Sequence, residues 1–195
     1  LTRARVVTAT TTDIDDRSTT VICETLARSR DADRLLVDVA DMRLRMASQH
    51  KGESRWDVKH HRGGLVDIEF IAQYLQLLHG PTHPRAFAEN TADALGRLGE
   101  AGIIGIDSVA KLVQALELWW RLQDALRLMV SASFVEETAP AALKAALARA
   151  ASQPDFETLC GTMDTTYATV RDLYRSIVDE PAEDARRRLP PDAGI

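Results

Sequence analysis

The sequence is poor in aromatic residues and cysteines, and it lacks any long uninterrupted hydrophobic segment. Phe, Trp and Tyr together make up 5% of the 195 residues. The longest apolar runs fall far short of the ~20 residues that a membrane-spanning helix needs, so we expect no membrane association. The two cysteines, Cys23 and Cys160, lie far apart and form no CxxC pair. This usage predicts reduced core thiols in a cytoplasmic protein.

Basic residues are also outnumbered in this sequence. It contains 24 Lys and Arg against 29 Asp and Glu, which gives a formal net charge of −5. A surface with this balance is unsuited as a whole to nucleic acid, so we expect no nucleic-acid partner. Any site for an anionic ligand must therefore be local. The first residue is Leu1 and not Met, and we expect the chain to be a piece of a longer one.

Sequence patterns typical of β-strands are missing, and helical periodicity takes their place. Hydrophobic residues make up 45% of the chain and recur at helical spacing almost throughout. The pattern predicts an all-α helical bundle with no substantial sheet, in one domain over residues 1–180. Residues 181–195 are polar and contain proline, which predicts a disordered tail. The expected helices are residues 13–29, 31–47, 65–79, 85–101, 107–131, 140–151 and 154–178.

One stretch, WDVKHHRGGLVDIEFIAQYLQLLHG at residues 56–80, joins two dissimilar halves. In the first half, a cluster of Lys, His and Arg precedes a Gly-Gly pair. The second half predicts a helix over residues 65–79 that is apolar enough to be mostly buried. Two carboxylates, Asp67 and Glu69, lie near the start of this helix. Cations, paired glycines and acids within so few residues raise the possibility of a binding site.

The Gly63–Gly64 pair would let the backbone approach a ligand closely or adopt a positive φ. The unpaired N–H groups at the start of the following helix would then point at that ligand, and Lys59 and Arg62 would add positive charge beside them. Asp67, in the first turn, suits the positive end of the helix dipole. Together these features are typical of a phosphate site at a helix N-terminus.

A plain helix start is the alternative interpretation of the same residues. In that interpretation the glycines form a turn, Asp67 is an ordinary first-turn acid and Glu69 is solvated. Spacing alone favours the plain helix start, because short glycine-containing motifs have low specificity. In the phosphate-site interpretation, Glu69 lies on the polar stripe of the helix and would contact a metal, a ribose or the hydroxyl of a nucleophile.

The same stretch closely resembles the signature that opens the helical domain of glutamine synthetase adenylyltransferase, a bifunctional adenylyl transferase and removase. That signature has a Lys, a short spacer, Gly-Gly-Leu or Gly-Gly-Ile, then Asp/Glu-Ile-Glu-Phe, a Gln and a Leu-rich run ending in His-Gly. The likeness extends over residues 1–178, and LTRARVV resembles the helix that follows the catalytic core of the family. The residues that meet the signature are Lys59, Gly63, Gly64, Leu65, Asp67, Ile68, Glu69, Phe70, Gln73 and Gly80.

The resemblance implies an activity, cofactors and partners. One half of the family's enzyme attaches AMP from ATP to a tyrosine of glutamine synthetase, and the other half removes it by phosphorolysis, which regulates nitrogen assimilation. The removing half carries Arg-Glu where this chain has Val66 and Asp67, so the chain resembles the C-terminal, adenylylating half. The implied partners are glutamine synthetase, a PII-type signal protein and an upstream nucleotidyltransferase core, and the implied cofactors are ATP and Mg²⁺.

The acids that bind metal in that superfamily are absent from this sequence. Members of the superfamily hold Mg²⁺ with two acids at Asp-x-Asp spacing that follow a Gly-Ser on a strand. The two Asp-x-Asp segments here, at residues 13–15 and 31–33, follow no Gly-Ser, and we interpret both as helix caps. His79 and His83 have the spacing of a helical metal pair, but a Gly-Pro pair lies between them. We therefore expect no metal site, and no AMP transfer by this chain alone.

The resemblance also suggests how individual residues act in the intact enzyme. The helical domain would cover the open side of the core, and its glycine-flanked helix start would neutralise phosphate charge as pyrophosphate leaves. Glu69 would support catalysis by orienting a water, a Mg²⁺ ligand or the tyrosine hydroxyl. This hypothesis requires an open tip, and a tip sealed against the chain's own side chains would contradict it. The candidates for nucleotide or phosphate binding are Lys59, Arg62, Gly63, Gly64, Asp67 and Arg43.

Two other functions stay open at this point. The first is a protein-docking or regulatory helical module that binds glutamine synthetase or a PII-type regulator through exposed faces, such as residues 85–102 or the last helix. The second is the helical domain of the related uridylyltransferase that acts on PII protein. The continuation of the signature over residues 73–80 argues against this uridylyltransferase.

Overall fold

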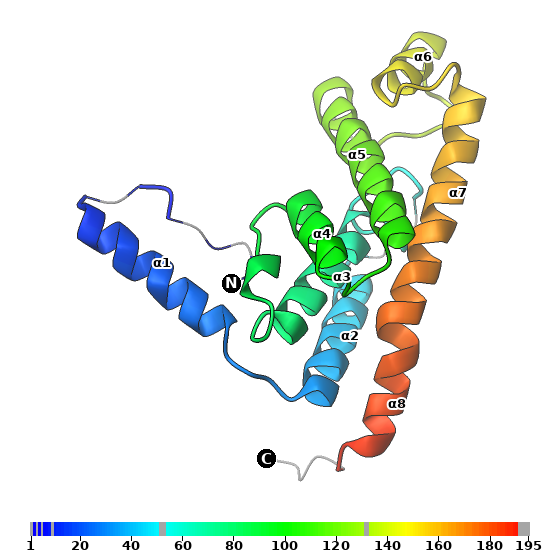
Figure 1. Ribbon diagram of the computed structural model, residues 1–195. Coiled ribbons are helices and arrows are strands. Elements are labelled where there is room, and N and C mark those ends of the chain that lie inside the picture. Colours follow the sequence, from blue (N-terminus) through cyan, green and yellow to red (C-terminus); the bar gives the residue numbers. More distant parts are fainter. Residues whose placement is uncertain are drawn as a thin grey trace.

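The computed structural model describes residues 2, 4, 6–8, 10–50, 54–130 and 133–190. Within these residues the chain forms helices and no strand, which confirms the predicted all-α bundle. Figure 1 shows the elements along the chain. They are α1 (Thr12–Leu26), α2 (Ala32–Gln49), α3 (Leu65–His79), the 3₁₀ turn η1 (Pro84–Ala86), α4 (Thr91–Glu100), α5 (Ile106–Met129), α6 (Ala141–Ala150), α7 (Phe156–Tyr174), the π-helical turn η2 (Arg175–Asp179) and α8 (Glu180–Arg188).

Side-chain caps fix where several helices begin. Asp31 accepts a hydrogen bond of 2.8 Å from a first-turn amide of α2, so the interpretation of residues 31–33 as a cap is confirmed. α1 is capped by Thr11 and not by Asp13, which lies in the first turn. Asn90 caps α4. The helix expected over residues 85–101 therefore begins only at Thr91.

α3 lies at the centre of the bundle, where it contacts α2, α4, α5 and α7. Its residues Ile68 and Ile71 are completely buried, and Trp119 of α5 and Tyr174 of α7 are buried in the same core. The observed bounds, Leu65–His79, confirm the helix predicted for residues 65–79. Gln76 is buried as well, and its side-chain oxygen accepts a hydrogen bond from a backbone amide of the following loop.

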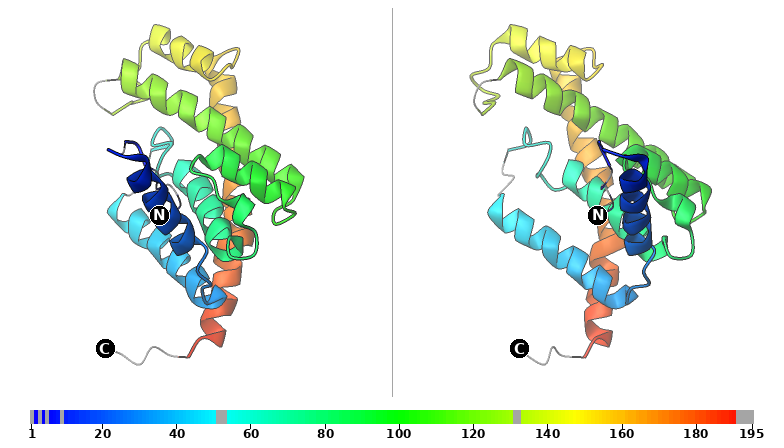
Figure 2. Two further views of the ribbon diagram at one scale, coloured as in Figure 1. Left: turned by 60° about the vertical axis from the view of Figure 1, so that its left-hand side comes forward. Right: turned by 90° about the vertical axis from the view of Figure 1, so that its left-hand side faces the viewer.

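α7, η2 and α8 form one continuous rod along the bundle (Figures 1 and 2). α5 and α6 pack against α7, whereas α2 packs against η2 and α8. A proline within a continuous helix removes one backbone hydrogen bond. The π-helical turn η2 ends at Asp179, two residues before Pro181, and it is the irregular part of the rod.

The prediction of a disordered tail from residue 181 is wrong for residues 181–188. These residues form α8, and Ala182 and Ala185 are completely buried where α8 packs on α2. The segment looked disordered because its buried face consists of small alanine side chains among charged residues. Residues 191–195 lie outside the described part of the chain. Two exposed ion pairs also join α8 to α2, namely Arg186–Asp41 and Arg188–Asp33.

α1 projects away from the rest of the bundle (Figure 1). Of its fifteen residues, Leu26 alone is buried. The described residues before α1 are not helical, so the helix that LTRARVV suggested by resemblance is not found there. Cys23 is exposed on α1 and Cys160 is partly buried. The prediction of a core thiol is therefore wrong for Cys23, because α1 is not part of the core.

We expect Ala182→Asp to lower the free energy of unfolding by at least about 2 kcal/mol, because it places an unpaired charge in the contact between α8 and α2. Glu183→Ala, at the exposed neighbouring position, is the matched control and should change this free energy by less than about 0.5 kcal/mol. Urea unfolding followed by circular dichroism measures both variants. Wild-type stability of Ala182→Asp would mean that α8 does not pack on α2.

Candidate functional site

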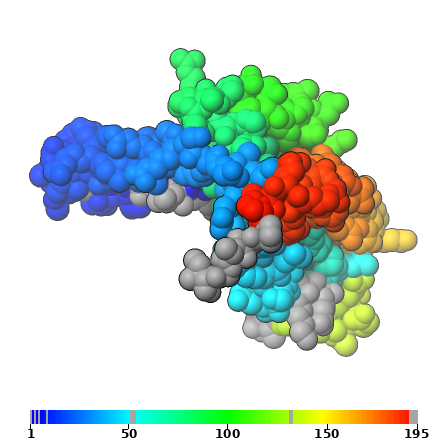
Figure 3. Space-filling view, turned by 90° about the horizontal axis from the view of Figure 1, so that it is seen from below, coloured from blue at the N-terminus to red at the C-terminus, as the bar shows by residue number. Residues whose placement is uncertain are grey.

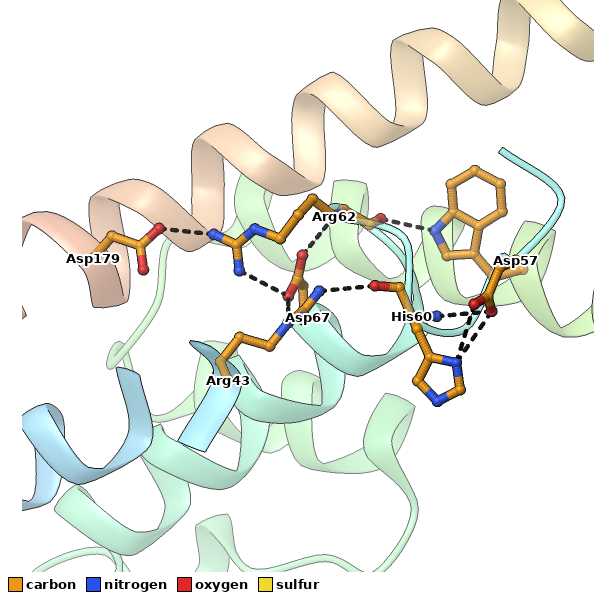
Figure 4. A network of polar contacts seen from close by, with 8 residues as sticks. Arg43, Asp57, His60, Arg62, Asp67 and Asp179 are labelled. Atoms are coloured by element: carbon orange, nitrogen blue, oxygen red, sulfur yellow. Dashed lines mark hydrogen bonds and ion pairs between the residues drawn. The ribbon is translucent and has the colours of Figure 1, made fainter. Parts of the chain in front are cut away.

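The basic, glycine-containing stretch forms a compact turn that leads into α3. We call residues 57–67 the α3 tip. Figure 4 shows side chains from three elements pointing toward one another at this tip. Arg43 comes from α2, Arg62 and Asp67 belong to the tip, and Asp179 comes from η2. The tip is therefore the place where α2, α3 and the long rod meet.

The amides at the start of α3 are paired within the chain. α3 has no side-chain cap, and its first amides donate instead to carbonyl oxygens of the preceding turn. The carboxylate of Asp67 closes the turn by accepting a further amide. The hydrogen bonds are Gly64 N to His61 O at 2.8 Å, Leu65 N to Val58 O at 3.0 Å, Val66 N to Lys59 O at 3.1 Å and Gly63 N to Asp67 Oδ2 at 2.5 Å.

Gly63 lies where another helix approaches the backbone closely. Its φ is +90°, and a Cβ at this position would lie 2.3 Å from the backbone oxygen of Tyr167 in α7. Its own carbonyl accepts a hydrogen bond of 3.2 Å from Trp119 Nε1 of α5. The positive φ and the missing side chain thus permit packing of the tip against α7 and α5.

Asp67 and Arg43 form an ion pair at the base of the tip. Arg43 Nε lies 2.5 Å from Asp67 Oδ1, and both side chains are almost completely shielded from solvent. Arg43 Nη2 also donates to the His60 carbonyl at 3.0 Å. A carboxylate that loses its hydration needs such partners, because burial of an unpaired charge is very unfavourable.

Arg62 extends this network toward the surface (Figure 4). Its Nη1 lies 3.4 Å from Asp67 Oδ1, and its Nη2 donates to Asp179 Oδ2 at 2.9 Å. Its guanidinium also lies over the Tyr174 ring, 4.8 Å from the ring centroid. The side chains of Arg62 and Asp179 are 38% and 37% exposed. Burial raises the pKa of Asp179, and the positive charge of Arg62 opposes this shift.

The four charged side chains alternate in sign along the network. The order is Arg43, Asp67, Arg62 and Asp179, so two positive and two negative charges balance. Asp67 by itself faces two arginines, and Asp179 compensates the second of them. Because these residues come from α2, the tip and η2, the network fixes the position of the tip relative to both neighbours.

The histidines of the basic cluster also have partners within the chain. Asp57 Oδ1 accepts a hydrogen bond from the His60 amide at 3.1 Å and lies 3.2 Å from His60 Nδ1. The His60 ring stacks on His50 with centroids 4.2 Å apart. The His61 ring packs against Tyr167 at 4.4 Å. The cluster therefore contributes packing as well as charge.

The prediction that this tip offers unpaired amides to a phosphate is wrong. The amides of the Gly63–Gly64 pair have partners within the chain, and Gly63, Gly64, Asp67 and Arg43 are buried. These four residues are buried and shape the tip, and direct contact with a nucleotide stays an untested prediction for them. The sequence could not reveal this burial, because the Tyr167 backbone and Arg43 that fill the space come from other helices.

Lys59, Arg62 and Glu69 differ from the other candidates because solvent reaches them. Lys59 is exposed, Arg62 is partly exposed, and Glu69 in the second turn of α3 is also partly exposed. Glu69 takes part in a polar interaction within the chain. A role in phosphate binding stays a prediction for Lys59 and Arg62, and so does the supporting role of Glu69.

Sequence reasoning missed Asp179 and Tyr174 as parts of this site. Asp179 is separated from Arg62 by 117 positions, and it lies one residue past the helix expected over residues 154–178. No local pattern distinguishes an acid that pairs across the bundle from one that is solvated. Trp119 is completely buried, and its hydrogen bond to the Gly63 carbonyl was not predicted either.

Neither a metal cluster nor a membrane-spanning helix is found in the described part of the chain. No group of three or more His, Cys, Asp or Glu side chains there is placed to hold a metal ion. His79 ends α3, and its ring meets that of His83 edge-on at 6.4 Å. No helix among the described residues is long and apolar enough to cross a bilayer.

We expect Asp67→Asn to lower the free energy of unfolding by about 3–5 kcal/mol, because it leaves the buried Arg43 charge without a counter-ion. Asp179→Asn removes an equal charge from the partly exposed end of the same network and should cost about 1 kcal/mol or less. Urea unfolding measures both variants. Similar decreases in the free energy of unfolding for the two variants would show that burial does not make Asp67 more important for stability than Asp179.

Gly63→Ala and Gly161→Ala should have opposite effects on stability. The first forces a Cβ into the Tyr167 backbone at a positive φ and should destabilise the protein by more than about 1 kcal/mol. The second replaces a glycine inside α7 that has open space around it, and it should stabilise by about 0.5–1 kcal/mol. Thermal unfolding of both tests this, and a neutral Gly63→Ala would refute the close contact.

The chain is similar to bifunctional glutamine synthetase adenylyltransferase/adenylyl-removing enzymes from several organisms. It is 38% identical over 183 residues to that of Xanthobacter autotrophicus, a match that covers 94% of this chain. The identity is 39% over 180 residues for Bradyrhizobium diazoefficiens and 41% over 179 residues for Rhodopseudomonas palustris strain HaA2, covering 92% and 91% of this chain. In each case the chain spans 18% of the length of the relative.

A sequence model of the family described as GlnD PII-uridylyltransferase matches residues 32–178. This range begins with the first residue of α2 and ends within η2. It contains the whole α3 tip and the helices packed around it, but not α1. The match covers most of the chain, although it ends just before Asp179 and α8. The chain therefore belongs to the GlnD PII-uridylyltransferase family, and the curated relatives named above are bifunctional glutamine synthetase adenylyltransferase/adenylyl-removing enzymes.

Proposed function

We propose that this chain is the helical part of a glutamine synthetase adenylyltransferase, from the half that attaches AMP from ATP to a tyrosine of glutamine synthetase. The observation that carries this proposal is the identity of 38–41% over 91–94% of the chain to enzymes of that name. The other half of such an enzyme would remove AMP by phosphorolysis. The chain by itself would not transfer AMP, because the acids that bind Mg²⁺ would lie in an upstream nucleotidyltransferase core.

The residues at positions 66 and 67 support assignment to the attaching half. The removing half carries Arg-Glu where this chain has Val66 and Asp67. Here Val66 is buried, and the Asp67 carboxylate lies 2.5 Å both from Arg43 Nε and from the Gly63 amide. A longer Glu or a charged Arg would not fit these buried contacts without rearrangement. The contacts of the tip therefore suit the Val and Asp found here better than the Arg and Glu of the removing half.

The tip would act on the nucleotide through the side chains that remain accessible. Lys59 and Arg62 would attract and orient the phosphates, an electrostatic role that is strongest when the site is closed to water. Arg43, Asp67 and the Gly63–Gly64 pair would act as positioning residues that hold this loop in shape. Arg62 already pairs with Asp179 at 2.9 Å, so a phosphate would compete with that carboxylate for the guanidinium.

The residues of the tip fit a phosphate better than a metal ion. Its one fully buried carboxylate, Asp67, already faces two arginines, and its other carboxylate, Asp57, lies 3.2 Å from His60 Nδ1. Magnesium would neutralise charge on the phosphates of ATP from the core. Glu69 would orient the incoming tyrosine hydroxyl or a water from this side of the site. We place the enzyme in the cytoplasm, with glutamine synthetase and a PII-type signal protein as partners.

A second candidate is a helical module that binds a PII-type protein or docks glutamine synthetase without contacting the nucleotide. The match of residues 32–178 to a family described as GlnD PII-uridylyltransferase favours it. The helical domain of a PII uridylyltransferase is a separate alternative, and relatives named glutamine synthetase adenylyltransferases do not favour it over the main proposal. The two proposals differ in which surface is sensitive, namely the tip for the enzyme and other exposed faces for the docking module.

In the full-length enzyme, we expect Lys59→Ala and Glu69→Ala each to slow adenylylation of glutamine synthetase by about tenfold or more, equivalent to about 1.4 kcal/mol. Lys111→Ala removes an exposed lysine of α5 and is the matched control, with an expected rate close to that of the wild type. Steady-state kinetics with ATP and circular dichroism measure activity and folding. Wild-type rates in both tip variants would end the proposed role of the tip.

Titration of the isolated chain separates the two candidates. The enzymatic proposal predicts that Mg-ATP shifts the backbone amide signals of the α3 tip, because Lys59 and Arg62, the side chains proposed to bind the phosphates, lie there. Shifts that appear only with glutamine synthetase or a PII-type protein, at surfaces away from the tip, would favour the docking module. NMR spectra of the same labelled sample record both titrations.

A further inference from the structure

α1 is held apart from the bundle along most of its length. Figures 1 and 3 show it projecting to one side of the molecule. Its contacts with the other described helices are at most marginal. Only Leu26, at the end that leads into α2, is buried. A helix in this position gains little of the packing energy that stabilises the others.

One face of α1 presents apolar side chains that the described part of the chain leaves uncovered. Ile14 and Val21 are 46% and 60% exposed, and their spacing of about two helical turns places them on the same face. Arg17, Ser18 and Ile22 lie beside them on the same face of the helix. Surfaces of this kind are typical of contacts with another protein surface.

The composition of α1 makes a covering surface necessary. Seven of its fifteen residues are Thr, Val or Ile, which are β-branched and only moderate helix formers. Isolated helices shorter than about 12–15 residues are marginal in water even when they are rich in alanine. α1 has the length of such a marginal helix and lacks their favourable composition. It therefore needs a packing partner to be stable.

α1 is included in the sequence match to the adenylyltransferase relatives, but it lies outside the residues matched by the family model. The family model begins at residue 32, after α1 has ended. The match to the Xanthobacter enzyme includes 183 residues of this chain, and residues 32–195 number only 164. At least 19 of the residues before α2 therefore belong to that match. α1 is thus shared with the adenylyltransferases, although it is not part of the bundle.

We propose that α1 is a docking arm that packs into an apolar groove of the polypeptide preceding Leu1 in the adenylyltransferase. This inference rests on the proposed function, in which a nucleotidyltransferase core lies upstream. α1 is the first helix along the described chain, so an upstream segment would be its neighbour in sequence. Most of the length of each relative lies outside the matched residues. That length is sufficient for a further domain with a groove for α1.

The charges of α1 define the rim of the groove that would receive it. Its acidic residues outnumber its one basic residue, Arg17, which lies 3.6 Å from Asp13. An apolar groove edged with Lys and Arg side chains would complement this helix. The acidic residues of α1 are Asp13, Asp15, Asp16 and Glu24.

Hydrogen exchange of residues 12–26 tests the docking arm. In the 195-residue chain these amides should exchange quickly, and in the full-length enzyme they should exchange at least about tenfold more slowly. Val21→Lys in the full-length enzyme should abolish this protection. Ile106→Lys changes another exposed apolar residue, 68% exposed at the start of α5, and should leave the protection of α1 intact. Both variants of the 195-residue chain should unfold at the wild-type temperature.

Two results would overturn the docking arm. Equally fast exchange of α1 in the short chain and in the full-length enzyme would show that nothing upstream covers it. Protection that grows with concentration of the 195-residue chain, with a dimer in light scattering, would assign the face to a second copy. AMP transfer by the same wild-type preparation separates this inference from the proposed function. Transfer with an unprotected α1 refutes only the arm, and protection without transfer refutes only the adenylyltransferase.

Discussion

The burial of Asp67 against Arg43 is the constraint around which the bundle is organised. An unpaired charge at this depth would be strongly destabilising, so α2, the α3 tip and η2 must bring their charged groups together. Asp67 also accepts the Gly63 amide, which ties the turn to the first residues of α3. Gly63 in turn allows the α7 backbone to approach. One carboxylate thus links the electrostatics of the tip to the packing of three neighbouring elements.

This arrangement explains why a glycine-containing helix start can resemble an amide-lined phosphate site although its amides are paired within the chain. A positive φ and a missing Cβ serve any backbone that must come close, whether the neighbour is a ligand or another helix. Here the neighbour is α7, and the amides that a phosphate would need are bonded to the preceding turn. The charge that remains accessible, on Lys59 and Arg62, lies on the outer surface of a rigid turn. A binding role for the tip must use these side chains.

The paired amides of the tip and the exposed face of α1 change where a neighbouring domain is expected to pack. The sequence pointed to the tip, whereas the structure points to α1. The amides of the tip are paired within the chain, whereas α1 exposes Ile14 and Val21 and has at most marginal contacts with the other described helices. A domain that packs on α1 would extend the fold beyond the helices matched by the family model. The bundle and the projecting helix thus have different structural roles, although they are continuous in sequence.

The sequence by itself determined the helical class and the bounds of α3, because apolar periodicity and the flanking glycines are local signals that packing did not override. Only the tertiary structure decided that Asp67 is a buried ion-pair partner rather than an ordinary first-turn acid. Its partner Arg43 comes from α2, and Asp179 of η2 pairs with Arg62, the second arginine beside it. The tertiary structure also decided that α8 is packed, because two buried alanines in a charged segment carry no apolar pattern. Contacts between residues distant in sequence are set by the assembled fold, and single-sequence periodicity contains no record of them.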